Sequence, residues 1–292
     1  MGKGTFYHAE TEEQAIQYLK ENIGHAVILA GGTDLMVQVN QYNYPEETVF
    51  VGIEDIPQLQ GIRITGDSIQ IGSLVTAAEI AKSSVVKEYA RALAMAAQES
   101  ASPQVRNRAT LGGNVGTASP SADMAAALIA LNAEAEIVGA DGVRMMKVED
   151  IGIFVKKTCL KDTEFIRRFI VKKKQNKENS SFQKMGKRKA MTISIVNIAA
   201  SVKLSEDQKK IESVRVAAGA CAPTIKRLRT FEHALEGCDA TETVVKGYAG
   251  MTLNDVEPIT DMRATEWYRK EIVQVLAVRA VCDAIRAAER EV

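Results

Sequence analysis

The chain has 292 residues, of which 46% are hydrophobic and 25% are charged, and its 37 basic residues balance 37 acidic ones. These values are typical of a globular protein of two or three domains. No apolar run reaches the roughly 18 residues of a membrane-spanning helix, and the first residues lack the apolar core of a signal peptide. We therefore expect a cytoplasmic protein whose partners are neither membranes nor nucleic acids.

The cysteines and histidines form none of the sequence patterns that bind metals. There is no C-x-x-C pair and no H-E-x-x-H pattern among Cys159, Cys221, Cys238, Cys282, His8, His25 and His233. The glycine patterns of P-loop ATPases and Rossmann dehydrogenases do not occur either. The sequence therefore favours no zinc hydrolase, P-loop ATPase or Rossmann enzyme, and any iron–sulfur cluster must lie on another chain.

The first 60 residues have the pattern of a mixed α/β unit. Thr11 and Gln14 predict a capping box ahead of an apolar helical stripe, which Gly24 would end. The apolar run 26–30 predicts a buried strand that leads directly into the sequence GGTDL. Residues 48–53 predict the next strand of this unit.

A second α/β unit is expected from residue 61 to residue 175. Alternating isoleucines predict a hairpin around Gly66, Thr76 with Glu79 predicts a capped helix, and the alanine-rich residues 84–100 predict another helix. The stretch ATLGGNVGTASPSAD, with three glycines and a proline, predicts neither a good helix nor a good strand. Beyond it we expect a helix over 123–131, a hairpin over 135–148 and a strand over 164–171.

The polar segment KKKQNKENSS, residues 172–181, predicts a linker and the main domain boundary. Strands over 192–204 and 211–220 are expected to pair antiparallel, with a mostly helical remainder. The last helix, 266–289, has an apolar stripe that we expect to face the core, formed by Ile272, Val275, Leu276, Cys282 and Ile285. The chain is thus divided into residues 1–60, 61–175 and 176–292.

A basic run between residues 167 and 189 contains ten lysines and arginines but only one acidic residue, Glu178. Such a run can bind nucleic-acid phosphates, but few aromatic residues accompany it and the rest of the chain offsets its charge. We favour a solvated linker. Docking of an acidic partner chain or of an adenine dinucleotide remains the alternative.

Both glycine-rich stretches can expose consecutive backbone N–H groups to an anion. Glycine adopts positive φ and lets a phosphate approach the main chain closely. Residues 31–33 could hold one phosphate and Thr110 with residues 112–114 a second, which predicts a diphosphate or dinucleotide site, with Asp123 accepting from ribose hydroxyls. The alternatives are simple tight turns for the glycines and a stabilising helix-end charge for Asp123.

Taken together, LAGGTDL at 29–35 and RNRATLGGNVGTASPSAD at 106–123 resemble the paired signature of the FAD-binding medium subunit of the molybdenum hydroxylases, the xanthine and carbon monoxide dehydrogenase family. Residues 182–204 resemble the opening of that family's C-terminal flavoprotein domain, so the resemblance covers essentially the entire chain. It implies an α+β fold with a vanillyl-alcohol-oxidase-type FAD-binding domain of two α/β subdomains. A C-terminal α+β domain with a small antiparallel sheet and helices would follow.

The resemblance also implies which residues contact FAD, and it implies neither a catalytic residue nor a metal ligand on this chain. Lys184 would stabilise the anionic reduced ring, and Ile166 would be an apolar contact to it. The complete set that the resemblance gives is Leu29, Ala30, Gly31, Gly32, Thr33, Asp34, Leu35, Ala109, Thr110, Gly113, Asn114, Thr117, Ala118, Asp123, Ile166 and Lys184.

By the same resemblance, the chain does not transform the organic substrate. A large subunit with molybdenum cofactor would hydroxylate the substrate, a small subunit with two iron–sulfur clusters would pass electrons to FAD here, and NAD or another acceptor would take them. The assembly would be a dimer of heterotrimers. Hydroxylation of a purine such as xanthine is the favoured reaction, while nicotinate, carbon monoxide or aldehyde substrates, a stand-alone flavin oxidoreductase and a non-enzymatic dinucleotide-binding protein remain open.

Overall fold

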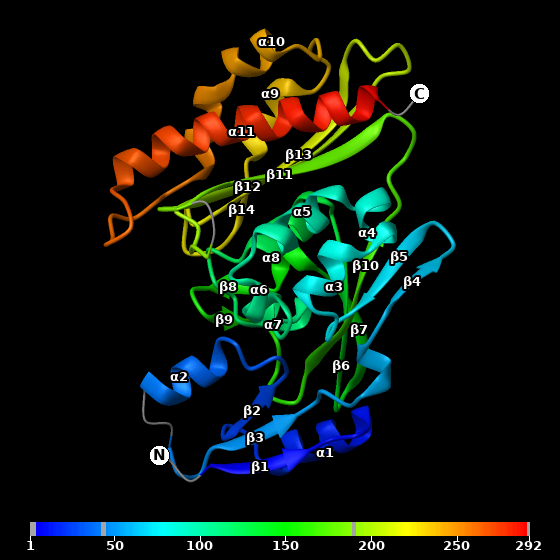
Figure 1. Cartoon of the computed structure of the whole chain (residues 1–292), viewed down its shortest axis with the longest axis vertical. Helices are drawn as coiled ribbons and strands as arrows, with labels where there is room; N and C mark the ends of the chain where they lie inside the picture. Colours follow the sequence, from blue (N-terminus) through cyan, green and yellow to red (C-terminus); the bar gives the residue numbers. More distant parts are fainter. Residues whose placement is uncertain (1–3, 42–44, 189–190, 291–292) are drawn as a thin grey trace.

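The computed structural model describes residues 4–41, 45–188 and 191–290, which form three units along the long axis of the molecule (Figure 1). The N-terminal unit is a parallel sheet in the order β1-β3-β2. Helix α1 packs against β2 and β3 of this sheet, and the short helix α2 follows β2 along the chain. The elements are β1 (Thr5–His8), α1 (Glu12–Glu21), β2 (Ala26–Leu29), α2 (Leu35–Gln41) and β3 (Val49–Gly52).

The middle unit is a five-stranded antiparallel sheet in the order β4-β5-β10-β6-β7, with helices packed against it. Its strands are β4 (Ile62–Thr65), β5 (Ser68–Gly72), β6 (Glu134–Gly139), β7 (Gly142–Lys147) and β10 (Phe165–Lys172). Its helices are α3 (Ala77–Lys82), α4 (Ser84–Tyr89), α5 (Arg91–Glu99), α6 (Pro103–Arg106), α7 (Leu111–Gly116) and α8 (Asp123–Ala130). Short elements are η1 (Pro57–Leu59), η2 (Val148–Asp150) and the hairpin β8 (Gly152–Phe154) with β9 (Lys157–Thr158).

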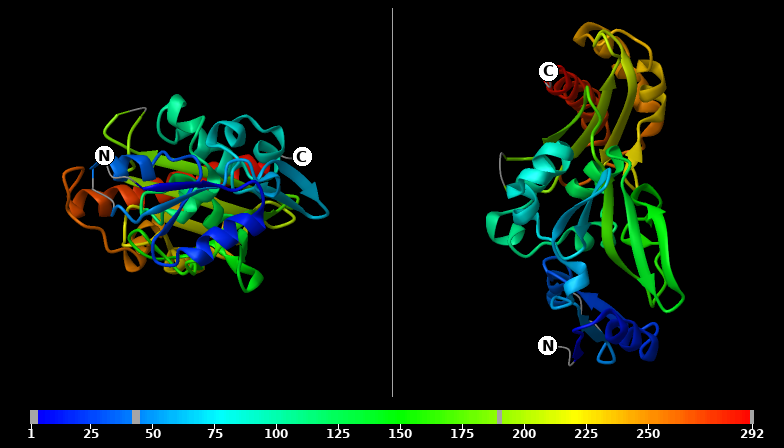
Figure 2. Two further views of the ribbon diagram at one scale, coloured as in Figure 1. Left: turned by 90° about the horizontal axis from the view of Figure 1, so that it is seen from below. Right: turned by 90° about the vertical axis from the view of Figure 1, so that its right-hand side faces the viewer.

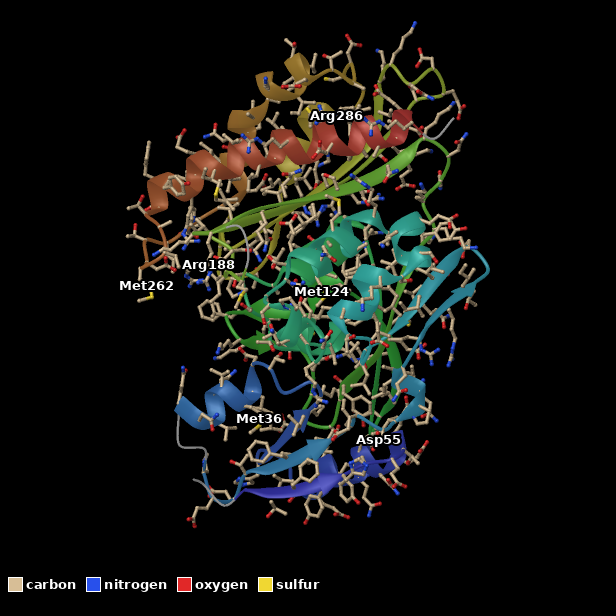
Figure 3. All side chains as sticks on the ribbon, viewed as in Figure 1. Met36, Asp55, Met124, Arg188, Met262 and Arg286 are labelled. Carbon is tan, nitrogen blue, oxygen red and sulfur yellow. The ribbon has the colours of Figure 1, made fainter. Side chains whose placement is uncertain are left out.

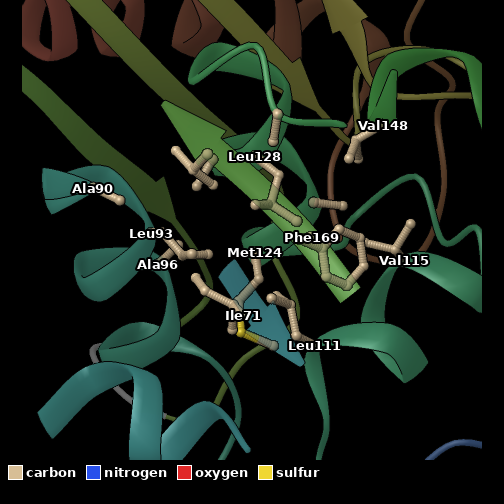
Figure 4. Close-up of a cluster of buried hydrophobic side chains, with 14 of the residues drawn as sticks. Ile71, Ala90, Leu93, Ala96, Leu111, Val115, Met124, Leu128, Val148 and Phe169 are labelled. Atoms are coloured by element: carbon tan, nitrogen blue, oxygen red, sulfur yellow. The ribbon is translucent and has the colours of Figure 1, made fainter. Parts of the chain in front are cut away.

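The core of the middle unit explains why α8 carries so little polar sequence. All eight of its residues are buried, and the helix contacts α5 and α7 of the middle unit as well as β12 and β13 of the C-terminal unit. Met124 and Leu128 of α8 lie among Ile71, Leu93 and Phe169 in the same cluster (Figure 4). Burial of such side chains contributes about 1.5 to 3 kcal/mol each, so this cluster positions the two loops that flank α8.

The C-terminal unit is an antiparallel sheet in the order β11-β12-β13-β14, with α11 on one face and α5 and α8 on the other (Figures 1 and 2). Its strands are β11 (Glu178–Met185), β12 (Val196–Leu204), β13 (Ile211–Gly219) and β14 (Lys226–Arg227). The remaining elements are α9 (Arg229–Leu235), α10 (Glu242–Gly247), η3 (Ala249–Asp255) and α11 (Glu266–Glu289). For the three units together we propose the domain division 1–60, 61–175 and 176–292.

Several predicted elements differ in detail from the observed ones. The helix predicted over 84–100 breaks at Ala90, which has φ −142° and ψ 53°, into α4 and α5. In the first capping box, the Gln14 side chain accepts from the Glu10 N–H and not from the N–H of Thr11. The strand predicted from 192 begins at residue 196, and Val275 of the predicted core stripe is 42% exposed.

The predicted linker over 172–181 is wrong at both ends, because Lys172 is the last residue of β10 and residues 178–181 are the first four of β11. The polar side chains of residues 179–181 are buried, and backbone groups of two helices satisfy them. The Ser180 hydroxyl accepts from the Ala92 N–H at 3.0 Å, and the Ser181 hydroxyl donates to the Ala280 carbonyl at 2.6 Å. Composition alone cannot show that tertiary hydrogen bonds will compensate a polar strand.

The solvated-linker interpretation of the basic run is also wrong for four of its residues, which form ion pairs: Arg167, Arg168, Lys177 and Lys184. Arg167 forms a bidentate ion pair with Glu12 of α1 and a second contact, of 3.0 Å, with Glu136 of β6. Lys177 pairs with Glu206 at 2.5 Å. These charges are neutralised by carboxylates that are distant in sequence, so counting charges along the chain does not reveal the pairs. Lys189, the last residue of the run, lies outside the described residues.

Among the described helices, none combines the length and apolar character needed to cross a bilayer.

We predict that the Arg144–Glu164 pair stabilises the β6–β7 hairpin in a pH-dependent way. Arg144 donates two hydrogen bonds of 2.8 Å to Glu164, whose side chain is 6% exposed. These bonds hold the pKa of the Glu164 carboxyl below its usual value. Its contribution is therefore complete above the unfolded-state pKa of about 4.3 and is lost as the pH falls from there through the folded-state pKa.

Glu164→Gln should lower the unfolding free energy by about 1.5 to 3 kcal/mol at pH 7, measured by urea denaturation. The difference from the unsubstituted protein should shrink below about pH 4.3. Glu10→Gln, at an exposed position, is the control and should show neither effect. A constant difference between pH 3 and pH 7 would contradict the assignment to this ion pair.

Candidate functional site

A cavity of about 1050 Å³ lies where the N-terminal unit, the middle unit and residues 191–194 meet. Cavities that bind drug-sized ligands span about 300 to 1000 Å³, so this one can hold a ligand of dinucleotide size. Both glycine-rich stretches line it, the first from the end of β2 and the second from α7 and the loop before α8.

The first stretch forms an open backbone cradle at one wall of this cavity. Gly32 has φ +72°, a left-handed conformation that favours glycine. The backbone N–H groups of residues 31–35 donate no hydrogen bond to any residue that the structure describes. Free N–H groups in a turn that leads into a helix are an anion-binding arrangement, so this part of the prediction has the required geometry.

Gly31 has a different role, because it allows the two stretches to touch. A Cβ at Gly31 would lie 1.8 Å from the Arg108 carbonyl oxygen, a distance that no side chain tolerates. The backbone of the first stretch therefore packs directly against the backbone that precedes Ala109. This contact places the cradle opposite the second stretch across the cavity.

The second stretch does not form the free anion nest that was predicted. Residues 111–116 are helical, and Thr110 caps this helix by accepting from the Gly113 N–H at 3.1 Å. The Gly112 N–H donates to the Ser73 carbonyl at 2.8 Å, and the Asn114 N–H donates to the Thr110 carbonyl at 3.0 Å. Because these donors already have partners, this stretch contributes side chains and shape to the cavity.

Asp123 and Lys184, for which separate contacts to a cofactor were expected, are paired with each other. Lys184 Nζ lies 2.6 Å from Asp123 Oδ2, and the two side chains are only 5% and 8% exposed. The other carboxylate oxygen of Asp123 accepts from the Ser194 hydroxyl at 2.6 Å and from Asn197 Nδ2 at 2.7 Å. Lys184 also donates to the Glu99 carbonyl at 3.2 Å. The cavity wall here contains a buried ion pair instead of a free carboxylate.

Most of the residues expected at the site do line the cavity. Three do not line it: Leu29 ends β2, Ala118 accepts from the Lys156 N–H at 3.0 Å, and Lys184 pairs with Asp123. Those in the wall are Ala30, Gly31, Gly32, Thr33, Asp34, Leu35, Ala109, Thr110, Gly113, Asn114, Thr117, Asp123 and Ile166.

Sequence reasoning missed a third group of lining residues. Ser73 follows β5, Lys156 and Thr158 belong to the β8–β9 hairpin, and Ser194 precedes β12. The Ser73 hydroxyl is buried and has no partner among the described residues. No periodicity or motif marks these positions, because a turn, a hairpin tip and a loop bring them together only in the folded chain. The described residues include no group of His, Cys, Asp or Glu able to hold a metal ion.

Comparison with known protein families gives two matches that follow one another along the chain. Residues 2–172 match the model described as the FAD binding domain in molybdopterin dehydrogenase. Residues 180–284 match the CO dehydrogenase flavoprotein C-terminal domain. The cavity is formed mainly by the first of these regions and is completed by residues 191–194 of the second.

Individual relatives agree with these matches over nearly the complete chain. The xanthine dehydrogenase FAD-binding subunit of Escherichia coli O157:H7 is 31% identical over 287 residues, 97% of each chain. The nicotinate dehydrogenase FAD-subunit of Eubacterium barkeri is 28% identical and covers 85% of this chain and 84% of its own. Among solved structures, the carbon monoxide dehydrogenase from Hydrogenophaga pseudoflava superposes with a TM-score of 0.92 at 26% identity, covering 98% of both chains.

We predict that Asp123 and Lys184 are energetically coupled. Asp123→Asn leaves the Lys184 ammonium buried without its counter-ion and should cost about 3 to 5 kcal/mol of unfolding free energy. Asp123→Asn combined with Lys184→Met should cost clearly less than the sum of the two single changes. Urea denaturation of the ligand-free protein measures this cycle.

The same double-mutant cycle on the exposed pair Lys161 and Asp141, whose side chains are 60% and 73% exposed, is the control. Its coupling should stay below about 1 kcal/mol. Additive effects at Asp123 and Lys184 would show that the buried contact contributes nothing specific.

Proposed function

Because this chain belongs to the FAD-binding subunits of the molybdopterin dehydrogenases, oxidoreductases of the xanthine dehydrogenase type, we propose that it holds one FAD in the cavity. It would accept electrons there from iron–sulfur clusters of a partner subunit and pass them to NAD or another acceptor. The resemblance found in the two glycine-rich stretches is confirmed at the level of the family, and so is the α+β fold. The observation that carries the proposed site is the free N–H cradle of residues 31–35 beside a cavity of dinucleotide size.

In the proposed arrangement, the cradle donates to the pyrophosphate of FAD. Each hydrogen bond to a charged oxygen contributes about 1.5 to 3 kcal/mol, so several of them can retain FAD without a covalent bond. Across the cavity, Thr110, Asn114 and Thr117 provide polar contacts, and Ile166 provides an apolar surface for the ring system. Leu29 and Ala118 support the cradle and the opposite loop from behind.

Bound FAD supplies the electron-accepting and electron-releasing chemistry that side chains lack. The chain's own residues hold and shield the cofactor and set the charge around it. Lys184 provides a buried positive charge near the wall, and Asp123 reduces that charge by pairing with it at 2.6 Å. A cation held in this way favours negative charge on a nearby ring without transferring a proton.

For the assembled enzyme we infer hydroxylation of a purine such as xanthine by a large subunit with molybdenum cofactor. A small subunit with two iron–sulfur clusters would connect it to this chain, in a dimer of heterotrimers. Two relatives named as xanthine dehydrogenase subunits, at 31% and 30% identity, support this choice over the nicotinate and carbon monoxide enzymes, at 28% and 27%. A nicotinate, carbon monoxide or aldehyde substrate, or a stand-alone flavin oxidoreductase, is the alternative.

Purification from the native host tests the proposed function. A visible spectrum with flavin and iron–sulfur bands, together with two co-purifying chains on a denaturing gel, is the expected result. Flavin on a lone chain would favour the stand-alone oxidoreductase. A colourless protein that does not bind added FAD would contradict the cofactor assignment.

We predict that Gly32→Ala weakens FAD binding at least tenfold, as measured by fluorescence titration of flavin-free protein. A Cβ at this position would lie 3.2 Å from the Leu29 side chain and 3.3 Å from the Met36 side chain, and φ +72° is strained for any residue with a Cβ, so the substitution should distort the cradle. Gly66→Ala, in the β4–β5 turn at φ +57° with no neighbouring atom, is the matched control and should leave FAD affinity unchanged. Equal FAD affinity in the two variants would move the pyrophosphate site elsewhere.

A further inference from the structure

Arg106 contacts the wall of the cavity without lining the cavity itself. Residues 100–102 connect α5 with α6 and form part of the wall, whereas Arg106, the last residue of α6, does not. Its guanidinium donates through Nη1 to two carbonyls of this segment, to that of Ser100 at 3.0 Å and to that of Ala101 at 3.1 Å. Arg106 begins the second signature stretch, yet the proposed FAD contacts do not include it.

Ala101 has a backbone conformation that is unfavourable without support. Its φ is +43°, in the left-handed region, where the Cβ of an L-residue crowds the backbone. A residue with a Cβ stays in this region only where the surrounding structure holds it. The Arg106 guanidinium bonds the carbonyls on both sides of the Ala101 Cα, so it holds both peptide units that this conformation relates.

Holding these carbonyls also sets the direction of two N–H groups. In a planar trans peptide the C=O and the N–H point in opposite directions. With the two carbonyls directed at the guanidinium, the N–H groups of Ala101 and Ser102 point away from it. Neither N–H donates a hydrogen bond to a residue within the described ranges. Because Ala101 and Ser102 line the cavity, these donors are available to a ligand there.

A second cation binds the carbonyl that precedes this segment. Lys184 Nζ, which pairs with Asp123, also donates to the Glu99 carbonyl at 3.2 Å. Three consecutive carbonyls, those of residues 99–101, therefore accept from cationic side chains, and such charge-assisted hydrogen bonds are stronger than neutral ones. The wall is thus left with N–H donors, which suit a ligand that carries oxygen acceptors.

We propose that Arg106 is a positioning residue for the cofactor: it holds Ala101 in the left-handed conformation and so directs the N–H groups of Ala101 and Ser102 at an oxygen atom of FAD. The inference rests on the proposed function, since it needs FAD in the cavity. These donors belong to the middle unit, whereas the cradle of residues 31–35 follows β2 of the N-terminal unit. The two sets of N–H groups therefore bind the ligand from different units.

Titration of the full-length, flavin-free chain with FAD, followed by flavin fluorescence, tests this role. Arg106→Met keeps an unbranched side chain but removes the donors, and it should weaken FAD binding about tenfold. Adding Ala101→Gly should recover about threefold of that loss, because glycine adopts φ +43° without strain. Arg106→Lys keeps the charge without the planar fork of donors, so its affinity should lie between those of Arg106→Met and the unsubstituted chain. If Arg106→Met does not fold, Arg106→Lys with and without Ala101→Gly provides the same comparison.

Two controls match these variants. Arg286→Met removes a half-exposed guanidinium from α11 of the C-terminal unit, whereas Met124 of the cavity wall lies in the middle unit (Figure 3), so FAD affinity should not change. Gln208→Gly, at φ +58° between β12 and β13, is the control for Ala101→Gly. Added to Arg106→Met, it should give no recovery.

Full FAD affinity in the Arg106 variants would overturn the positioning role while the proposed function stands. A loss that Ala101→Gly does not recover would overturn it as well, because Arg106 would then act on the fold or on the ligand by another route. Equal recovery by Gln208→Gly would show a general effect of glycine at left-handed positions and would contradict the specific role of Ala101. If the unsubstituted chain does not bind FAD, the proposed function fails and the inference with it.

Discussion

The close approach of Gly31 to the Arg108 carbonyl is the constraint on which the cavity depends. Any side chain at residue 31 would overlap that oxygen, which a Cβ would approach to 1.8 Å, so the N-terminal and middle units can meet here only through bare backbone. The bidentate pair between Arg167 of β10 and Glu12 of α1 holds the same two units together at a second point. With both contacts in place, the free N–H groups after β2 face the second glycine-rich stretch across a space instead of being covered by it.

A second set of contacts ties the C-terminal unit to this space. Asp123 begins α8 in the middle unit, whereas Lys184, Ser194 and Asn197 belong to β11, the loop after it and β12. One buried carboxylate thus connects three segments of the C-terminal unit with the wall of the cavity. The cost of burying its charge is offset because a cation and two neutral donors surround it. This arrangement explains why the C-terminal unit matters for a cavity formed mostly by the first 172 residues.

Local chemistry explains which features were predictable from the sequence. The capped helices, the apolar strands and the cradle at residues 31–35 depend on neighbours within a few positions, and the sequence signals for them are direct. The linker predicted over 172–181 includes the first four residues of β11 because its serines are satisfied only by α5 and α11, which are 88 and 99 residues away along the chain. The prediction of a second anion-binding nest is wrong for a related reason. The backbone N–H groups of residues 112–114 donate to Ser73 and Thr110 and are not free to bind an anion. Hydrogen-bond partners that the fold brings together cannot be identified from the neighbouring sequence.

The inner wall of the cavity differs from the exposed surface around it. Inside, glycines, a capped short helix and a compensated ion pair leave few unsatisfied groups apart from the cradle, so a ligand with negative charge is favoured at one defined place. Outside, the side chains of Met36, Val37 and Phe154 are exposed, whereas those of Met191 and Ile193 are exposed and also line the cavity. Exposed apolar groups next to uncompensated charges give no stability to an isolated chain, and they become favourable only when a complementary surface covers them. The two surfaces therefore differ in origin: the cavity wall is shaped by the two glycine-rich stretches and the ion pair of Asp123, and the exposed apolar side chains belong to α2, the β8–β9 hairpin and the loop before β12.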